Sequence, residues 1–268
     1  MRGLSDKVGI VTGAGSGIGE AVARRLAEEG VRVAVVDINA TRAELVADDI
    51  RAGGGKAIGI AADISKEEEV EHAVRLTVAE FGQLDILHNN AAATAAAIIS
   101  RDCGVADAQA DVWDLTMSVN VRGTVLGCKY ALREMLPRRS GVIINTSSSS
   151  AILGDLTRAA YGASKAAIIS ITQHVATLYG RQGIRCVAVA PGPIITDALR
   201  AAAPEALPLF ERHLLLPRQG GTPEEIAGTV AFLASTDAAF ITGTTLVADG
   251  GLSSHTPWFA DVIAGMQA

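Results

Sequence analysis

The chain has 268 residues, 49% of them hydrophobic and 19% charged, which suffices for a sizeable core in a single α/β domain spanning residues 1–268. A net charge of −6 without a lysine and arginine cluster argues against a nucleic-acid-binding surface. The first residues lack the apolar core of a signal peptide, and no run of about 18 uncharged apolar residues occurs, so we expect a cytoplasmic protein outside membranes.

The chain opens with a strand, a glycine-rich turn and a helix. The apolar run at residues 7–12 predicts a buried strand, and the mixed pattern of residues 20–29 predicts a helix that Gly30 ends. Between them, residues 13–19 read Gly-Ala-Gly-Ser-Gly-Ile-Gly. Glycines let a backbone approach a pyrophosphate closely, and the free N–H groups at a helix start face the anion. The segment therefore predicts a dinucleotide-binding turn.

A second strand is predicted at residues 31–36, and Asp37 stands at its end. A carboxylate at this position beyond a glycine-rich turn reaches the hydroxyls of an adenosine ribose. The alternative is a solvated loop aspartate or a helix cap near Asn39 and Thr41. We favour the ribose role because of the turn that precedes Asp37.

Strands and helices alternate along the rest of the chain. We expect further helices at residues 41–52, 65–81, 111–136 and from 222, and strands at residues 56–61, 84–87, 141–146, 185–190 and 244–248. Residues 65–68 form a capping box, Pro137 ends the helix at 111–136, and Thr222 caps the last helix. This alternation predicts an α/β fold whose parallel sheet has helices on both faces and binds ligands beyond the carboxyl ends of its strands.

Several polar residues follow these strands or interrupt a helix. Asp63 and the turn at residues 89–91 fall at the ligand-binding edge of the sheet. Asn120 lies inside the helix at 111–136, where an amide is either solvated or hydrogen-bonded at a kink. His88 lines the sheet, and neither it nor the three cysteines have the spacing of a metal or redox site.

Tyr161 and Lys165 lie within an alanine-rich helix that begins near residue 159. Side chains four residues apart project from the same helix face, and an ammonium held near a phenol stabilises its phenolate form. Such a tyrosine is usable as an acid and base near neutral pH. The alternative is a surface tyrosine beside a lysine whose ammonium reaches the solvent.

Taken together, these segments resemble the classical short-chain dehydrogenase/reductase (SDR) family from about residue 5 to residue 252. The matching motifs are TGAGSGIG (12–19), Asp63, NNAA (89–92), Asn120, the serine run (147–150), YGASK (161–165), PGPIIT (191–196) and DGG (249–251). The resemblance implies a Rossmann-type doubly wound seven-stranded parallel sheet and a nicotinamide cofactor. It also implies a homotetramer whose usual interface is formed by the helices around 115–136 and 160–181.

The resemblance also implies catalytic roles for individual residues. Tyr161 would exchange a proton with the substrate oxygen, and Lys165 would assist the phenolate and bind the nicotinamide ribose. Asn120 would hold a water molecule that relays the proton outward. The family serine precedes the tyrosine by a spacing that selects Ser148, which would stabilise the charge on the substrate oxygen. Residues 147 and 149, both serines, are the alternatives if the loop register differs.

The cofactor contacts implied by the resemblance follow the sheet edge. They are Gly13, Ser16, Ile18 and Gly19 at the pyrophosphate, Asp37 at the ribose, Asp63 and Ile64 at the adenine, Asn90, Ala91, Tyr161 and Lys165 at the nicotinamide side, and Pro191, Gly192, Ile195 and Thr196 around the carboxamide. One departure is Ala92, where the family usually has glycine. Because Ile38 rather than a basic residue follows Asp37, we expect NAD as the cofactor.

We therefore expect an NAD-dependent alcohol dehydrogenase or ketone reductase. The alternatives are an NADPH-dependent 3-oxoacyl thioester reductase and a catalytically silent scaffold that binds the cofactor. The substrate should be selected by residues 92–110, by a lid at about 197–216 and by the C-terminal tail at 252–268. In the tail, apolar residues at 259, 262, 263 and 266 predict a short amphipathic helix that covers apolar surface near the lid, in its own subunit or in a neighbouring one. The alternative is a frayed terminus with incidental apolar residues.

Overall fold

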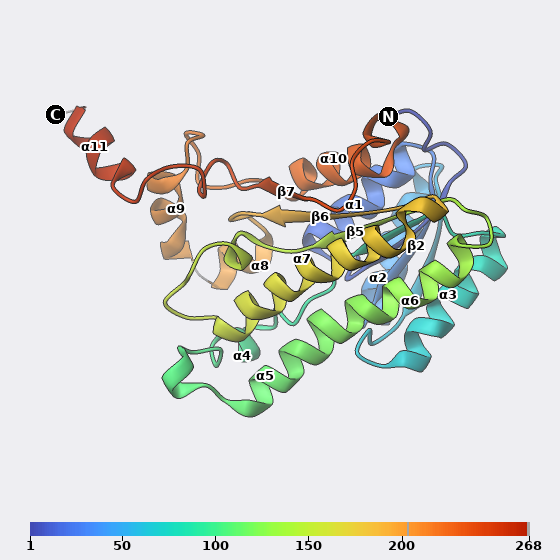
Figure 1. The fold of residues 1–268 in the computed structure, drawn as a ribbon, viewed down its shortest axis with the longest axis horizontal. Helices are drawn as coiled ribbons and strands as arrows, with labels where there is room; N and C mark the ends of the chain where they lie inside the picture. Colours follow the sequence, from blue (N-terminus) through green and yellow to red (C-terminus); the bar gives the residue numbers. More distant parts are fainter. Residues whose placement is uncertain (203, 267–268) are drawn as a thin grey trace.

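Seven parallel strands form one sheet in the computed structural model, which describes residues 1–202 and 204–266 (Figure 1). The order across the sheet is β3-β2-β1-β4-β5-β6-β7. The strands are β1 (Val8–Thr12), β2 (Arg32–Asp37), β3 (Lys56–Ala61), β4 (Ile86–Asn89), β5 (Gly141–Thr146), β6 (Ile184–Pro191) and β7 (Thr245–Ala248). The chain reverses its direction of travel across the sheet between β1 and β4, which is where open α/β sheets bind ligands. The expected doubly wound sheet is confirmed.

Helices supply the side chains that bury both faces of the sheet. One core cluster contains residues of α1 (Gly17–Glu28), α2 (Ala40–Ala52) and α10 (Pro223–Ala234), and the other contains residues of α3 (Glu67–Phe81), α6 (Gly123–Met135) and α7 (Ala159–Tyr179). Alternate residues of a strand belong to opposite clusters, as Ile86 and Leu87 do. Burial of such a side chain contributes about 1.5–3 kcal/mol, so the central strands are mostly apolar, and their polar residues, such as His88 and Asn89, lie toward the carboxyl ends.

Shorter elements connect these layers. They are α4 (Ala96–Ile99), η1 (Val105–Asp107), α5 (Ala110–Thr116), η2 (Met117–Arg122), η3 (Ser149–Ala151), η4 (Gly180–Gln182), α8 (Asp197–Ala202), η5 (Pro204–Ala206), α9 (Leu207–His213), η6 (Thr236–Ala238) and α11 (Phe259–Met266). The helix expected at 111–136 is present as α5, η2 and α6 in succession, and η2 is a π-helical segment that contains Asn120. The carbonyl of Asn120 accepts a hydrogen bond from the Thr124 hydroxyl at 2.7 Å, which satisfies a group displaced by the wider turn.

Two local expectations were wrong. Strand β4 is Ile86–Asn89 rather than 84–87, because His88 and Asn89 still pair with β5 and so lie within the sheet. Ser65 does not cap α3, since its hydroxyl donates to the Asp63 carboxylate at 2.7 Å and Lys66 occupies the cap position. The capping box expected at Thr222 is confirmed, with the Thr222 N–H donating to the Glu225 carboxylate at 2.9 Å.

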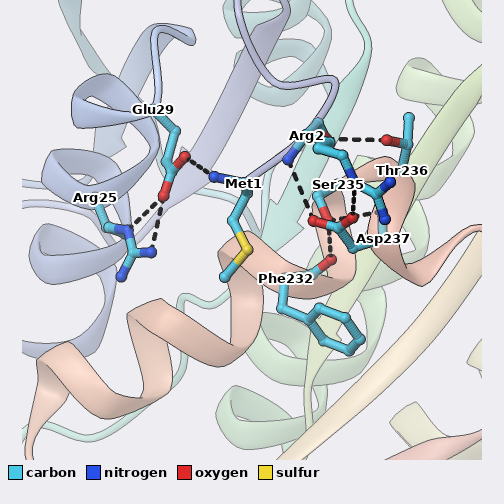
Figure 2. A network of polar contacts seen from close by, with 8 residues as sticks. All are labelled: Met1, Arg2, Arg25, Glu29, Phe232, Ser235, Thr236 and Asp237. Atoms are coloured by element: carbon cyan, nitrogen blue, oxygen red, sulfur yellow. Dashed lines mark hydrogen bonds and ion pairs between the residues drawn. The ribbon is translucent and has the colours of Figure 1, made fainter.

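The N-terminal residues attach to two helices on one side of the sheet (Figure 2). The terminal ammonium of Met1 pairs with Glu29, which also accepts from the Arg25 guanidinium at 2.8 Å. The Arg2 guanidinium pairs with Asp237, and the Arg2 N–H donates to the same carboxylate at 3.2 Å. These contacts hold the chain that leads into β1.

The last described helix projects away from the sheet (Figure 1). Helix α11 contacts α9, and an ion pair of 2.7 Å joins Arg212 to Asp261. The expected tail helix is therefore present within residues 252–266, while residues 267–268 of the predicted tail lie outside the described part. Within the described ranges, no helix is both long and apolar enough to cross a membrane.

Candidate active site

Two glycines of the turn between β1 and α1 stand where a side chain would not fit. A Cβ atom on Gly13 would lie 2.8 Å from the Cα of Ala91, and one on Gly19 would lie 2.1 Å from the Gly13 carbonyl oxygen. Gly13 also has a φ of +63°, in the left-handed region. Ser16 precedes α1 without a side-chain capping hydrogen bond, so N–H groups of the first helical turn face outward. This cradle fits a pyrophosphate.

Asn90 and Thr12 join the turn after β4 to the glycine-rich turn. The Asn90 side chain donates to the carbonyl groups of Thr12 at 3.1 Å and Gly13 at 3.3 Å. In return, the Thr12 hydroxyl accepts the N–H groups of Asn90 at 3.0 Å and Ala91 at 3.2 Å. Ala92, where the family usually has glycine, does not have a positive φ, so alanine is unstrained there.

Asp37 ends β2 beside the glycine-rich turn. Its carboxylate accepts the N–H groups of Gly15 and Asn39, both at 2.9 Å. The cap of α2 is Asn39, whose side chain accepts from the Arg42 N–H at 3.1 Å, so the alternative of Asp37 as the helix cap is wrong. A Cβ on Gly15 would lie 2.8 Å from the Cβ of Arg42, so a basic residue lies close to Asp37 and the glycine-rich turn. The sequence did not reveal this proximity.

Asp63 and Ile64 follow β3 and lie against the start of α6. The Asp63 carboxylate accepts from both the N–H and the hydroxyl of Ser65, and a Cβ on Gly123 would lie 2.6 Å from Ile64. Burial opposes ionisation of Asp63, but the hydrogen bonds from Ser65 and the charge of Lys66 hold its pKa below the ordinary value. Among the described residues, neither side chain hydrogen-bonds to the glycine-rich turn or to α7.

The segment after β6 closes the site from the other side. The Gly192 N–H donates to Ala248 at 3.0 Å and the Ile195 N–H donates to Gly221 at 2.8 Å, which fixes the turn that begins at Pro191. The Thr196 hydroxyl accepts the Leu199 N–H at 3.2 Å at the start of α8. A Cβ on Gly17 would lie 3.4 Å from the Thr196 side chain, so this segment and the glycine-rich turn meet.

Lys165 is buried and fixed beside the ring of Tyr161. Its side chain donates to the Thr146 carbonyl at 2.8 Å, and only 2% of Lys165 is exposed. The Lys165 nitrogen lies 5.5 Å from the centroid of the Tyr161 ring. Burial lowers the pKa of Lys165, whereas Tyr161 acts to raise it and the charge of Arg158 acts to lower it further. The alternative of a solvent-reaching lysine is therefore wrong.

His88 contacts the same threonine as this lysine, and it was not expected to take part in the site. Its Nε2 atom is 2.9 Å from the Thr146 hydroxyl, so Thr146 contacts His88 through its side chain and Lys165 through its carbonyl. Complete burial, assisted by the charge of Lys165, lowers the pKa of His88 to about 3. The histidine is therefore neutral at physiological pH.

The hydroxyl groups of the serine run after β5 have different hydrogen-bond partners. Ser147 is buried and donates to the Lys165 carbonyl at 2.8 Å, so its proton is committed to α7. The Ser148 oxygen accepts the Ser150 N–H at 3.2 Å, which leaves its own proton available to another acceptor. The short helix η3, which begins at Ser149, packs against α7.

Asn120 links the π-helical segment to the helix that carries Tyr161. Its oxygen accepts the Ala93 N–H at 2.8 Å, and its amide nitrogen donates to the Ser164 hydroxyl at 2.9 Å. The Ser164 hydroxyl in turn donates to the Tyr161 carbonyl at 2.7 Å. The reading of Asn120 as a hydrogen-bonding residue in an irregular helix, rather than a solvated one, is therefore confirmed.

Two further residues border Tyr161 and had no sequence signal. The Asp102 carboxylate accepts the N–H groups of Ala160 at 3.0 Å and Tyr161 at 2.9 Å. The Arg158 guanidinium lies 4.1 Å from the centroid of the Tyr161 ring. Only the fold brings Asp102, in an irregular segment, to the start of α7.

The region expected to select the substrate borders a cavity. The cavity has a volume of about 210 Å³, and its lining includes Pro193, Leu214 and Leu216. It therefore lies between the turn after β6 and the end of the lid, and Tyr161 and Lys165 do not line it. This cavity is therefore separate from the pair of Tyr161 and Lys165.

Comparisons with known proteins agree on a class of chemistry. A family model described as enoyl-(acyl carrier protein) reductase matches residues 13–253. The chain is 43% identical to a probable short-chain type dehydrogenase/reductase of Bradyrhizobium diazoefficiens, over 97% of this chain and 92% of that protein. It is 34% identical to a 7alpha-hydroxysteroid dehydrogenase of Bacteroides fragilis, over 96% and 98% of the two chains. It is 37% identical to a 3-oxoacyl-(acyl-carrier-protein) reductase of Synechocystis sp., over 94% and 99%.

Proposed function

We propose that this chain, which belongs to the short-chain dehydrogenase/reductase family, is an NAD-dependent enzyme that transfers a hydride between a secondary alcohol or ketone and nicotinamide. The observation that carries this proposal is the buried ammonium of Lys165, held by the Thr146 carbonyl beside the ring of Tyr161. This arrangement places a cationic side chain beside the phenol to which we assign the proton exchange.

The chain's own residues transfer the proton and orient the substrate. When bound, the nicotinamide supplies or accepts the hydride. The Tyr161 hydroxyl exchanges the proton with the substrate oxygen while Lys165 stabilises the phenolate. The Ser148 hydroxyl, whose proton has no acceptor among the described residues, donates to the substrate oxygen as charge develops there. Asn120 has the family role of holding a water molecule that relays the proton outward.

The cofactor choice rests on Asp37. Its carboxylate stands at the glycine-rich turn, where it would accept hydrogen bonds from the ribose hydroxyls and would repel a 2′-phosphate. The cradle of Gly13, Ser16, Ile18 and Gly19 would hold the pyrophosphate. The expected adenine, nicotinamide and carboxamide contacts complete the proposed cofactor site.

A second candidate is a 3-oxoacyl thioester reductase that uses NADPH. The nearness of Arg42 to Gly15 favours it, because a guanidinium is a suitable partner for a phosphate. The likeness to the Synechocystis 3-oxoacyl-(acyl-carrier-protein) reductase supports the substrate class of this candidate. A comparison of kcat/KM for NADH and NADPH, with ketones and with oxoacyl thioesters, separates the two candidates.

We place the enzyme in the cytoplasm as one domain that assembles into a homotetramer. The location rests on the sequence, in which residues 103, 128 and 186 are cysteines without the spacing of a metal or redox site. The tetramer rests on the family, whose usual interface involves the helices expected around 115–136 and 160–181.

The decisive experiment replaces the phenol of Tyr161. Tyr161→Phe is expected to keep NADH binding, measured by fluorescence titration, and to lower kcat by about 10²- to 10⁴-fold, the usual loss with a general acid and base. The matched control is Tyr179→Phe at the other end of α7, which should retain wild-type kcat. Wild-type kcat in Tyr161→Phe with any good substrate would overturn the proposed function.

A further inference from the structure

The helix that carries Tyr161 begins without a cap of its own. Its cap position is occupied by Arg158, which makes no side-chain capping hydrogen bond and has a left-handed backbone, with φ 63° and ψ 36°. Only glycine, asparagine and aspartate adopt that conformation readily, so an arginine there is strained. The N–H groups of the first helical turn need partners from elsewhere.

Asp102 supplies those partners from a distant part of the chain. One carboxylate oxygen accepts the Ala160 N–H at 3.0 Å and the other accepts the Tyr161 N–H at 2.9 Å. The Asp102 carbonyl accepts the Arg158 N–H at 2.7 Å, which also holds the strained residue. Asp102 is only 5% exposed, so both oxygens are largely withdrawn from water. Hydrogen bonds to an ionised acceptor are about twice as strong as neutral ones, and a negative charge is favoured at a helix N-terminus.

The result is that Tyr161 is held on both sides of its Cα atom. Asp102 fixes its N–H, and the Ser164 hydroxyl, itself oriented by Asn120, binds its carbonyl at 2.7 Å. Asn120 also accepts the Ala93 N–H. The hydrogen bonds on both sides of Tyr161 therefore involve the segment at residues 92–110. That segment therefore anchors Tyr161 as well as bordering the site.

We propose that Asp102 is a positioning residue that sets where the Tyr161 hydroxyl meets the substrate oxygen. The proposal rests on the proposed role of Tyr161 as the acid and base. Loss of the carboxylate frees the first turn of α7 and misplaces the phenol, and a misplacement of about 1 Å costs up to about 10²-fold in rate.

The test compares Asp102→Ala and Asp102→Asn with the wild type. We expect kcat to fall by about 10- to 100-fold in Asp102→Ala and by less in Asp102→Asn, which keeps one acceptor oxygen, while the Kd of NADH stays within about two-fold. The matched control is Asp114→Ala in α5, outside that segment, where the side chain is exposed, and it should leave all constants unchanged. Activities are measured well below the Tm of each variant and per folded molecule, so that lost stability does not count as lost catalysis.

A double-mutant cycle with Tyr161→Phe identifies the route of the effect. If Asp102 acts through the phenol, Asp102→Ala should cost less than about three-fold in kcat once the phenol is absent, because coupled residues are not additive. Equal losses in both backgrounds, or a lowered Tm with unchanged kcat per folded molecule, would overturn the positioning role. Retained activity in Tyr161→Phe alone would instead refute the proposed function and leave the measured effect of Asp102 to stand separately.

Discussion

His88 is neutral because it is completely buried. The free energy of unfolding of the protein therefore depends on pH in a defined way. Its pKa is lowered to about 3 in the folded state, against an ordinary value near 6.5. Between these pH values the unfolded chain binds a proton at His88 that the folded chain does not bind. The stabilisation of the folded state linked to His88 is therefore fully present above about pH 6.5 and is lost as the pH falls towards 3.

Replacement of His88 should therefore reduce the loss of stability in acid. Between pH 7.5 and pH 5, the wild type should lose about 2 kcal/mol more unfolding free energy than His88→Gln, in urea titrations at the two pH values. His174→Gln, which removes an exposed histidine of α7, is the control and should follow the wild type. Parallel losses in the wild type and in His88→Gln would show that His88 does not titrate on unfolding.

Asp37 and Arg42 both lie near Gly15, and in the proposed cofactor site the two charges favour different cofactors. Asp37→Ala should lower kcat/KM for NAD by about 10- to 100-fold, since hydrogen bonds to a charged acceptor are lost, and should raise the relative use of NADP. Adding Arg42→Ala should remove any such gain, because the guanidinium is then absent. Steady-state kinetics with both cofactors measures this, and an unchanged preference in Asp37→Ala would contradict the assignment.

At the scale of elements, most strands were predictable and the contacts between distant segments were not. The predicted strands 56–61 and 141–146 match β3 and β5, because short apolar runs ending in polar turns leave little choice. The places of the glycine-rich turn after β1 and of Asp37 at the end of β2 were also predicted from the sequence. Asp102 could not be found, since a carboxylate that caps a helix from a distant segment leaves no local pattern. Arg42 was missed for the same reason, as its approach to Gly15 depends on how α2 packs.

Helix α11 is the element whose packing remains incomplete within one chain. Its expected apolar positions Val262, Ile263 and Met266 are 46%, 38% and 77% exposed, although the helix contacts α9. We expect this face to be covered by the lid of a neighbouring subunit, where it walls an apolar substrate pocket.

Deletion of residues 255–268 tests this role. It should raise KM severalfold for apolar substrates and lower the Tm, because buried apolar contacts contribute to both. Asp261→Ala is the control, since the exposed ion pair with Arg212 is worth at most about 1 kcal/mol and its loss should change neither quantity. Unchanged KM values and Tm after the deletion would mean that the tail makes no contribution.

On the scale of the whole molecule, we expect a homotetramer. The two helical regions of the expected interface expose apolar residues, among them Leu115, Val125 and Leu178. Light scattering at micromolar concentration should therefore give the mass of four chains, and Leu178→Glu should yield smaller species by placing a charge in that interface. A wild-type monomer at this concentration would contradict the expectation.

The π-helical segment η2 also determines where this chain tolerates insertions and deletions. Each residue of a helix turns it by about 100°, so one residue removed within α6 would rotate every later side chain and carry Tyr130 and Met135 out of the core. One residue removed from Met117–Arg122 would instead return the wide turn to an ordinary one and leave the flanking helices in phase. In an alignment of relatives, single-residue gaps in this long helix should therefore cluster in those six positions.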